Sequence, residues 1–91
     1  MTARFVLLYE SADGVAQLAP AHFPAHLARI HEFRDRGEIL SVGTFADAQA
    51  QGAMGIFPTR EAAEAFVAGD PFVLNHVVRS YEIREWNDIL S

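Results

Sequence analysis

The sequence contains no cysteine and no lysine, and both absences narrow what the chain can do. Without cysteine, disulfides, thiol nucleophiles and cysteine-ligated metal sites are excluded. All seven basic residues are arginines, no two of them adjacent, and the net charge is −5. A nucleic-acid interface needs basic residues clustered on one face, so this pattern argues against nucleic acid as a partner.

Long apolar runs are also missing. No segment approaches the roughly 20 apolar residues that are needed to span a bilayer. The apolar stretch Phe5–Tyr9 near the N-terminus is too short for the core of a secretory signal peptide. We therefore expect a cytoplasmic protein that has no membrane partner.

The chain is short but rich in apolar residues, and this combination favours a homodimer. Residues 1–91 have room for a single domain with one core. Folding at this length buries only about 60–65% of the extended-chain surface. Since 51% of the residues are apolar, we expect a second copy to cover part of the apolar surface.

Hydrophobic periodicity divides the chain into four strands and two helices. The predicted strands are Arg4–Glu10, Glu38–Phe45, Ala53–Phe57 and Val77–Trp86. The predicted helices are Pro20–Arg36, with its regular part starting around Phe23, and Thr59–Gly69. We expect residues 11–19 to form a mobile loop and residues 46–52 to be a connector of small residues.

The element order β-α-β-β-α-β is that of the ferredoxin-like α+β fold, a four-stranded antiparallel sheet with both helices on one face. In the first predicted strand, Phe5 and Leu7 lie on one side and Val6 and Leu8 on the other. Both faces of the sheet therefore need cover. Packing two sheets face to face would supply it, which predicts a dimeric α+β barrel.

His26, at the margin of the apolar face of the first helix, is the main candidate for acid–base chemistry. Free imidazole has a reference pKa of about 6.5, so a histidine can give or take a proton near neutral pH. The alternative is a half-buried histidine that is satisfied by a backbone carbonyl.

Asp70 follows the second helix and precedes Pro71. Asp before Pro is typical of the N-cap of a short helix, so we expect one more helical turn over Phe72–Asn75. Spacing alone favours a structural cap. A capping carboxylate keeps one oxygen free, which leaves open whether that oxygen faces His26.

Arg29 and His22 are further candidates for substrate binding. Arg29 would present a planar fork of donors to a carboxylate or phenolate, and its alternative is a solvated arginine paired with a glutamate. His22 lies one turn before His26, but a catalytic zinc site takes three protein ligands. We expect His31 on the opposite side of the helix, so no third ligand is available and no metal is predicted.

Several segments together resemble the YciI-related (YCII) family. The motifs are His-Leu-x-Arg from His26, Gly-x-(Ile/Leu)-Leu-x-x-Gly from Gly37, and Asp-Pro-Phe from Asp70, with further similarity at 61–66 and 83–86. The resemblance implies a ferredoxin-like α+β dimer with a His–Asp active site, carried over onto His26 and Asp70. The family includes an enzyme that removes chloride from a chlorinated hydroxyhydroquinone, and its fold is similar to that of muconolactone isomerase.

Two corners depart from the family pattern. Asn75-His76 stands where many relatives have glycine, and Gly43-Thr44 replaces a common Gly-Pro. Asn and His tolerate left-handed backbone, so we expect the first corner to survive, with His76 as a further polar group near the pocket. The second change is expected to reshape the pocket wall.

The direction of the two helices decides whether His26 and Asp70 meet. We expect the helices to run roughly parallel, which would separate the start of the first from the end of the second. The pair then requires the Asp-Pro-Phe turn to fold back toward His26, or a partner subunit to complete the site.

These features predict a YciI-like enzyme without an organic cofactor, in which His26 is the general acid/base and Asp70 orients it. The expected reaction is elimination or isomerisation of a small aromatic or lactone-like compound. The side chains expected to bind it are Arg29, Tyr9, Phe72 and His22. The alternative is a non-catalytic dimer that binds a small ligand or a partner domain.

Overall fold

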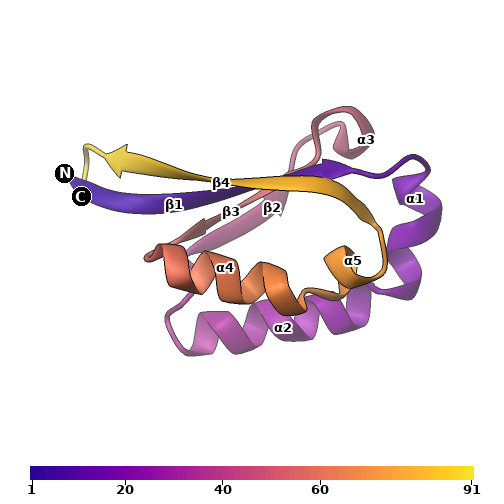
Figure 1. Cartoon of the computed structure of the whole chain (residues 1–91), viewed down its shortest axis with the longest axis horizontal. Coiled ribbons are helices and arrows are strands. Elements are labelled where there is room, and N and C mark those ends of the chain that lie inside the picture. Colours follow the sequence, from indigo (N-terminus) through magenta and orange to yellow (C-terminus); the bar gives the residue numbers. More distant parts are fainter.

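The computed structural model describes residues 1–91 and contains a four-stranded antiparallel sheet in the order β2-β3-β1-β4 (Figure 1). The strands are β1 (Thr2–Ser11), β2 (Ser41–Thr44), β3 (Ala53–Phe57) and β4 (Val78–Asp88). The main helices α2 (Phe23–Asp35) and α4 (Arg60–Gly69) cover one face of this sheet. The predicted ferredoxin-like order β-α-β-β-α-β is confirmed.

The ends of both main helices follow from local chemistry. Gly37 has a left-handed φ of 71°, and the amides of Gly37 and Glu38 bond to the carbonyls of Arg34 and Phe33, which closes the C-terminus of α2. Thr59 caps α4 by accepting from the amide of Ala62 at 3.1 Å. These predicted helix ends are confirmed. Because residues 37 and 38 complete the helix cap, β2 starts at Ser41, later than the predicted Glu38.

Short helical turns occupy two segments that were predicted to be irregular. The turns are α1 (Val15–Leu18) and α3 (Ala48–Gln51). A 3₁₀ turn (Ala19–Ala21) follows α1 and overlaps the start of the predicted first helix. The amide side chain of Gln49 in α3 ties the two segments together, because it accepts from the amide of Val15 and donates to the carbonyl of Ala12. These contacts join residues more than thirty positions apart, so residue periodicity does not reveal them.

The two main helices are antiparallel, so the expectation of parallel helices is wrong. β1 and β3 run in opposite directions, and each is followed by a helix that returns over the same face of the sheet. The start of α2 and the end of α4 therefore lie at the same end of the molecule, beside the short helix α5 (Pro71–Leu74) (Figure 1). No fold-back of the chain is needed to bring the two regions together.

The core lies between the sheet and the helices. Leu7 in the middle of β1 pairs with Gly55 of β3 and Ile83 of β4, and it is 3% exposed. Phe33 of α2 packs edge-on against Phe66 of α4 at 5.2 Å between ring centroids. The other members of the buried cluster are Ile39, Phe57, Ala62, Ala63 and Val67.

The opposite face of the sheet has no helix over it. Register places the even-numbered residues of β1 on this face, among them Val6 and Leu8, which lie opposite Arg84 and Glu82 of β4. Their neighbours on the same face are Met54, Ile56 and Trp86. Trp86 is 48% exposed.

No helix of the structure is long and apolar enough to cross a membrane.

Candidate functional site

Asp70 connects α4 to α5 and is completely buried, with 0% of its surface exposed. It is the N-cap of α5, because its Oδ1 accepts from the amide of Phe72 at 3.1 Å, and Pro71 occupies the first helical position. The predicted capping role is therefore present, and it fixes the carboxylate at the C-terminal end of α4.

His26, in the second turn of α2, contacts this carboxylate directly. Its Nδ1 lies 2.6 Å from Oδ1 of Asp70, and the residue is 8% exposed. The oxygen that faces the imidazole is the same oxygen that caps α5, so the open question is answered: the other oxygen does not face His26. One Asp70 oxygen serves the fold and the imidazole at once.

The second oxygen of Asp70 is taken by Tyr9 of β1. The Tyr9 hydroxyl donates to Oδ2 at 2.5 Å. Burial, followed by the hydrogen bond to Asp70 and its negative charge, raises the pKa of Tyr9 far above the ordinary value for a phenol. Tyr9 therefore stays a neutral donor, and both carboxylate oxygens of Asp70 are hydrogen-bonded.

Aromatic packing sets the orientation of the imidazole. The ring of Phe72 stacks on His26 with centroids 3.8 Å apart and planes within 7° of each other. Phe66 meets the imidazole edge-on, with its ring centroid 6.2 Å from that of His26. With Nδ1 held by Asp70, Nε2 is the nitrogen that is left for a ligand. We call Tyr9, His26, Asp70 and Phe72 the Asp70 cluster.

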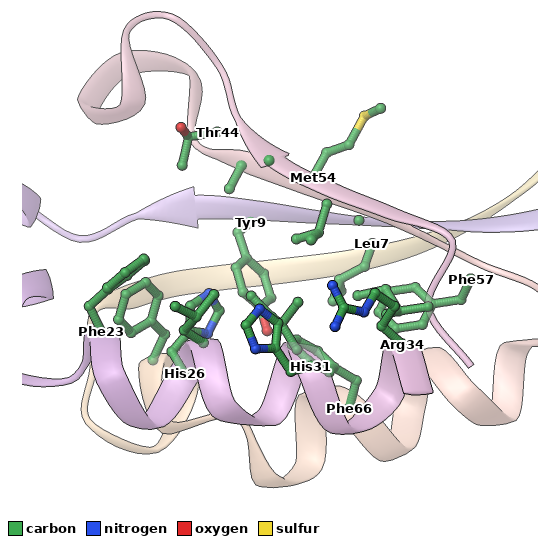
Figure 2. A pocket seen from close by; sticks show the side chains of 18 residues that line it. Leu7, Tyr9, Phe23, His26, His31, Arg34, Thr44, Met54, Phe57 and Phe66 are labelled. Carbon is green, nitrogen blue, oxygen red and sulfur yellow. The ribbon is translucent and has the colours of Figure 1, made fainter. Parts of the chain in front are cut away.

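A cavity of about 460 Å³ adjoins this cluster, between α2 and the sheet (Figure 2). His26, Tyr9 and Phe72 are part of its wall. Twelve of the eighteen residues that line it are hydrophobic, so it fits a small, mainly apolar molecule. The apolar lining includes Leu7, Phe23, Leu27, Ile30, Ile39 and Phe57.

Not all predicted substrate-binding residues reach this cavity. Arg29 donates from Nε and Nη2 to the carbonyls of Phe66 and Ala65, so its guanidinium caps the end of α4. His22 precedes α2, and it is not among the residues that line the cavity. His76 is exposed at the corner after α5, with φ of 58°, and also lies outside the cavity wall.

Two polar residues of the cavity wall, His31 and Arg34, were missed, whereas Thr44 lies in the wall as expected for the Gly43-Thr44 corner. His31 and Arg34 of α2 and Thr44 of β2 line the open side, and all three are exposed. We call them the polar rim. His31 lines the cavity although it lies about 140° around the helix from His26, so the expectation that it points away from the site is wrong. The spacing of His31 and Arg34, one turn apart, was the available signal.

The histidines do not gather into a metal site. His22, His31 and His76 make no hydrogen bond to the Asp70 cluster, and no three His, Asp or Glu side chains are grouped as metal ligands. The arrangement instead joins one imidazole to one carboxylate beside an apolar cavity, which is suited to proton transfer on a bound small molecule.

A family model described as a YCII-related domain matches residues 3–87. Among curated proteins, none matches the sequence.

Three solved structures share the fold. The 5-chloro-2-hydroxyhydroquinone dehydrochlorinase TftG of Burkholderia phenoliruptrix AC1100, in complex with 2,5-dihydroxybenzoquinone, is 19% identical with a TM-score of 0.74, over 92% of this chain and 93% of that one. An antibiotic biosynthesis monooxygenase is 14% identical with a TM-score of 0.59, over 97% and 99%. Protein Atu4242 of Agrobacterium tumefaciens is 10% identical with a TM-score of 0.59, over 94% and 92%. At these identities the likeness shows the fold.

Proposed function

The chain belongs to the YCII-related domain family, and we propose that it is a small-molecule enzyme in which His26 transfers the proton. The observation that carries this proposal is the 2.6 Å contact between His26 Nδ1 and the buried Asp70, beside a cavity of about 460 Å³. A carboxylate on one ring nitrogen leaves the other to act on a bound substrate.

Asp70 has two effects on the imidazole in this proposal. Its Oδ1 accepts from Nδ1–H, which selects the tautomer with the lone pair on Nε2, the form that acts as a base. Its negative charge then stabilises the imidazolium that forms when Nε2 takes a proton. Tyr9 and the Phe72 amide hold the carboxylate in place during this cycle.

The reaction class that fits is elimination or isomerisation of a small ring compound. In an elimination, Nε2 takes a proton from the substrate, the electron pair of the broken bond forms a new double bond, and the leaving group departs with its own bonding pair. In an isomerisation, His26 returns the proton to a different atom. The likeness to a dehydrochlorinase supports the first of these.

We also propose that the protein is a homodimer built through the uncovered face of the sheet. Val6, Leu8, Met54 and Ile56 lie there without a helix over them, beside the half-exposed ring of Trp86. A second sheet packed on this face would remove that apolar area from water. The mass in solution, measured by light scattering, tests this part.

A pair of histidine variants tests the catalytic proposal. The wild type is incubated with 5-chloro-2-hydroxyhydroquinone and with muconolactone, and release of chloride or isomerisation is followed. His26→Asn should lower kcat/KM by at least about a hundredfold while the protein stays folded, because the proton acceptor is lost. His76→Asn makes the same chemical change on the surface and should leave the rate unchanged.

Two outcomes would contradict the proposal. One is a His26→Asn variant that keeps most of the wild-type rate. The other is a folded wild type that converts neither compound, which would favour a protein that only binds ligands.

A further inference from the structure

We propose that the cavity takes an anionic ring compound, a carboxylate or phenolate, and that Arg34 recognises its negative charge. This inference names the substrate class of the proposed enzyme, so it rests on the proposed function for its biological meaning. It can be tested by binding alone, which needs no turnover.

No acidic residue lines the cavity. The chain has twelve Asp and Glu residues and a net charge of −5, yet none of the eighteen residues that line the cavity is Asp or Glu. The ionisable residues that the wall does contain, apart from the neutral phenol of Tyr9, are Arg34, His26 and His31. The nearest carboxylate, that of Asp70, lies behind the wall, where His26 and Tyr9 hold both of its oxygens. The charged side chain that a ligand meets in the wall itself is therefore the guanidinium of Arg34, which favours a negatively charged ligand.

The position of Arg34 allows it to hold one end of such a ligand. It stands two turns beyond His26 on α2, and Figure 2 shows its guanidinium extending into the space between α2 and the sheet. The backbones of the two residues are about 12 Å apart along the helix. A single ring that carries a charged substituent, together with the long arginine side chain, covers this distance.

Arg34 is also free to bind a ligand. Its contact with Asp35 is long, at 3.5 Å, and both side chains are mostly exposed. Arg36, by contrast, is paired with Glu32 at 2.7 Å and Glu38 at 3.1 Å, and it does not line the cavity. A guanidinium without a close partner can present its planar fork of donors to a carboxylate or phenolate.

The test compares two rings of nearly the same shape and different charge. 2,5-Dihydroxybenzoquinone is a vinylogous acid and is anionic near neutral pH, whereas its dimethyl ether is neutral. Calorimetric titration of the wild type should show the anion binding about tenfold more tightly, because only the anion can accept charge-assisted hydrogen bonds from Arg34. Arg34→Gln should remove this preference, and Arg36→Gln, the matched control, should keep it.

The inference is overturned if the ether binds as tightly as the anion, if neither ring binds, or if Arg34→Gln and Arg36→Gln behave alike. A titration of His26→Asn separates it from the proposed function. That variant should still bind the anion even though it has lost turnover. If the wild type binds the anion through Arg34 but shows no turnover, the inference about the ligand stands and the proposed catalytic function is excluded.

Discussion

The Asp70 cluster and the polar rim border the same cavity but differ in how their side chains are held. In the Asp70 cluster, both oxygens of a fully buried carboxylate are bonded, and an aromatic ring is stacked on the imidazole. In the polar rim, His31, Arg34 and Thr44 are exposed, and Arg34 makes only a long contact to Asp35. The first region is built into the fold and should contribute to stability, whereas the second should be able to change without affecting the fold.

Removing the Asp70 carboxylate should have the largest effect on stability. Asp70→Ala leaves the Tyr9 hydroxyl, the Phe72 amide and the His26 ring without their acceptor, and breaking such a buried pair costs about 3–5 kcal/mol. Urea denaturation measures the loss. Arg34→Gln in the polar rim should stay within about 0.5 kcal/mol of the wild type. Equal effects of the two variants would break the contrast between the two regions.

The Tyr9 hydroxyl should give the next largest effect, and one that depends on pH. Tyr9→Phe leaves the buried Oδ2 of Asp70 without a donor, at a cost of about 1–3 kcal/mol near neutral pH. In the folded wild type the pKa of Tyr9 is raised, so Tyr9 stays protonated, whereas in the unfolded chain a tyrosine releases its proton near pH 10. The Tyr9 contribution is therefore complete below about pH 10 and falls as the pH rises further.

The measurement is the free energy of unfolding of both proteins between about pH 8 and pH 11. The advantage of the wild type over Tyr9→Phe should shrink above about pH 10. An advantage that stays constant over this range would show that the Tyr9 hydroxyl ionises equally in both states. Tyr81, which is half exposed, is the matched control, because Tyr81→Phe removes a phenol that has no bond to Asp70.

Gly69 should give the smallest effect, and its sign should depend on Arg29. A methyl group on Gly69 would lie 2.6 Å from Nη2 of Arg29, so Gly69→Ala must displace the guanidinium that caps α4. We expect a loss of about 1 kcal/mol in the wild type. In an Arg29→Ala background the same change should be neutral or stabilising, because alanine is favoured over glycine in a helix by about 1 kcal/mol. A double-mutant cycle measured by denaturation detects the coupling, and additive effects would exclude it.

Much of the fold could be predicted because its signals are local. The helix end at Gly37, the cap at Thr59 and the cap at Asp70 each depend on a few neighbouring residues, and each is present. The expected direction of the helices was wrong although the predicted antiparallel sheet implies the correct one, because β1 and β3 run in opposite directions and each is followed by a helix that returns over the same face.

The site was predictable only in part, because its contacts join residues that lie far apart in the sequence. The His26–Asp70 pair was suggested by resemblance, but the bond from Tyr9 to Asp70 spans 61 positions and leaves no trace in the spacing. Arg29 was expected to bind substrate, and the carbonyl groups at the end of α4 that it caps are 36 and 37 positions away. His31 and Arg34 were missed because the cavity between α2 and the sheet is a property of packing.

The single tryptophan has a consequence for future measurements. Trp86 lies opposite Arg4 on the sheet face that the helices leave uncovered, whereas the Asp70 cluster lies on the other side of the sheet. Its fluorescence should therefore shift to shorter wavelength when another copy covers that face, and stay unchanged when a ligand enters the cavity. The fluorescence of Trp86 would thus report formation of the proposed dimer separately from ligand binding in the cavity.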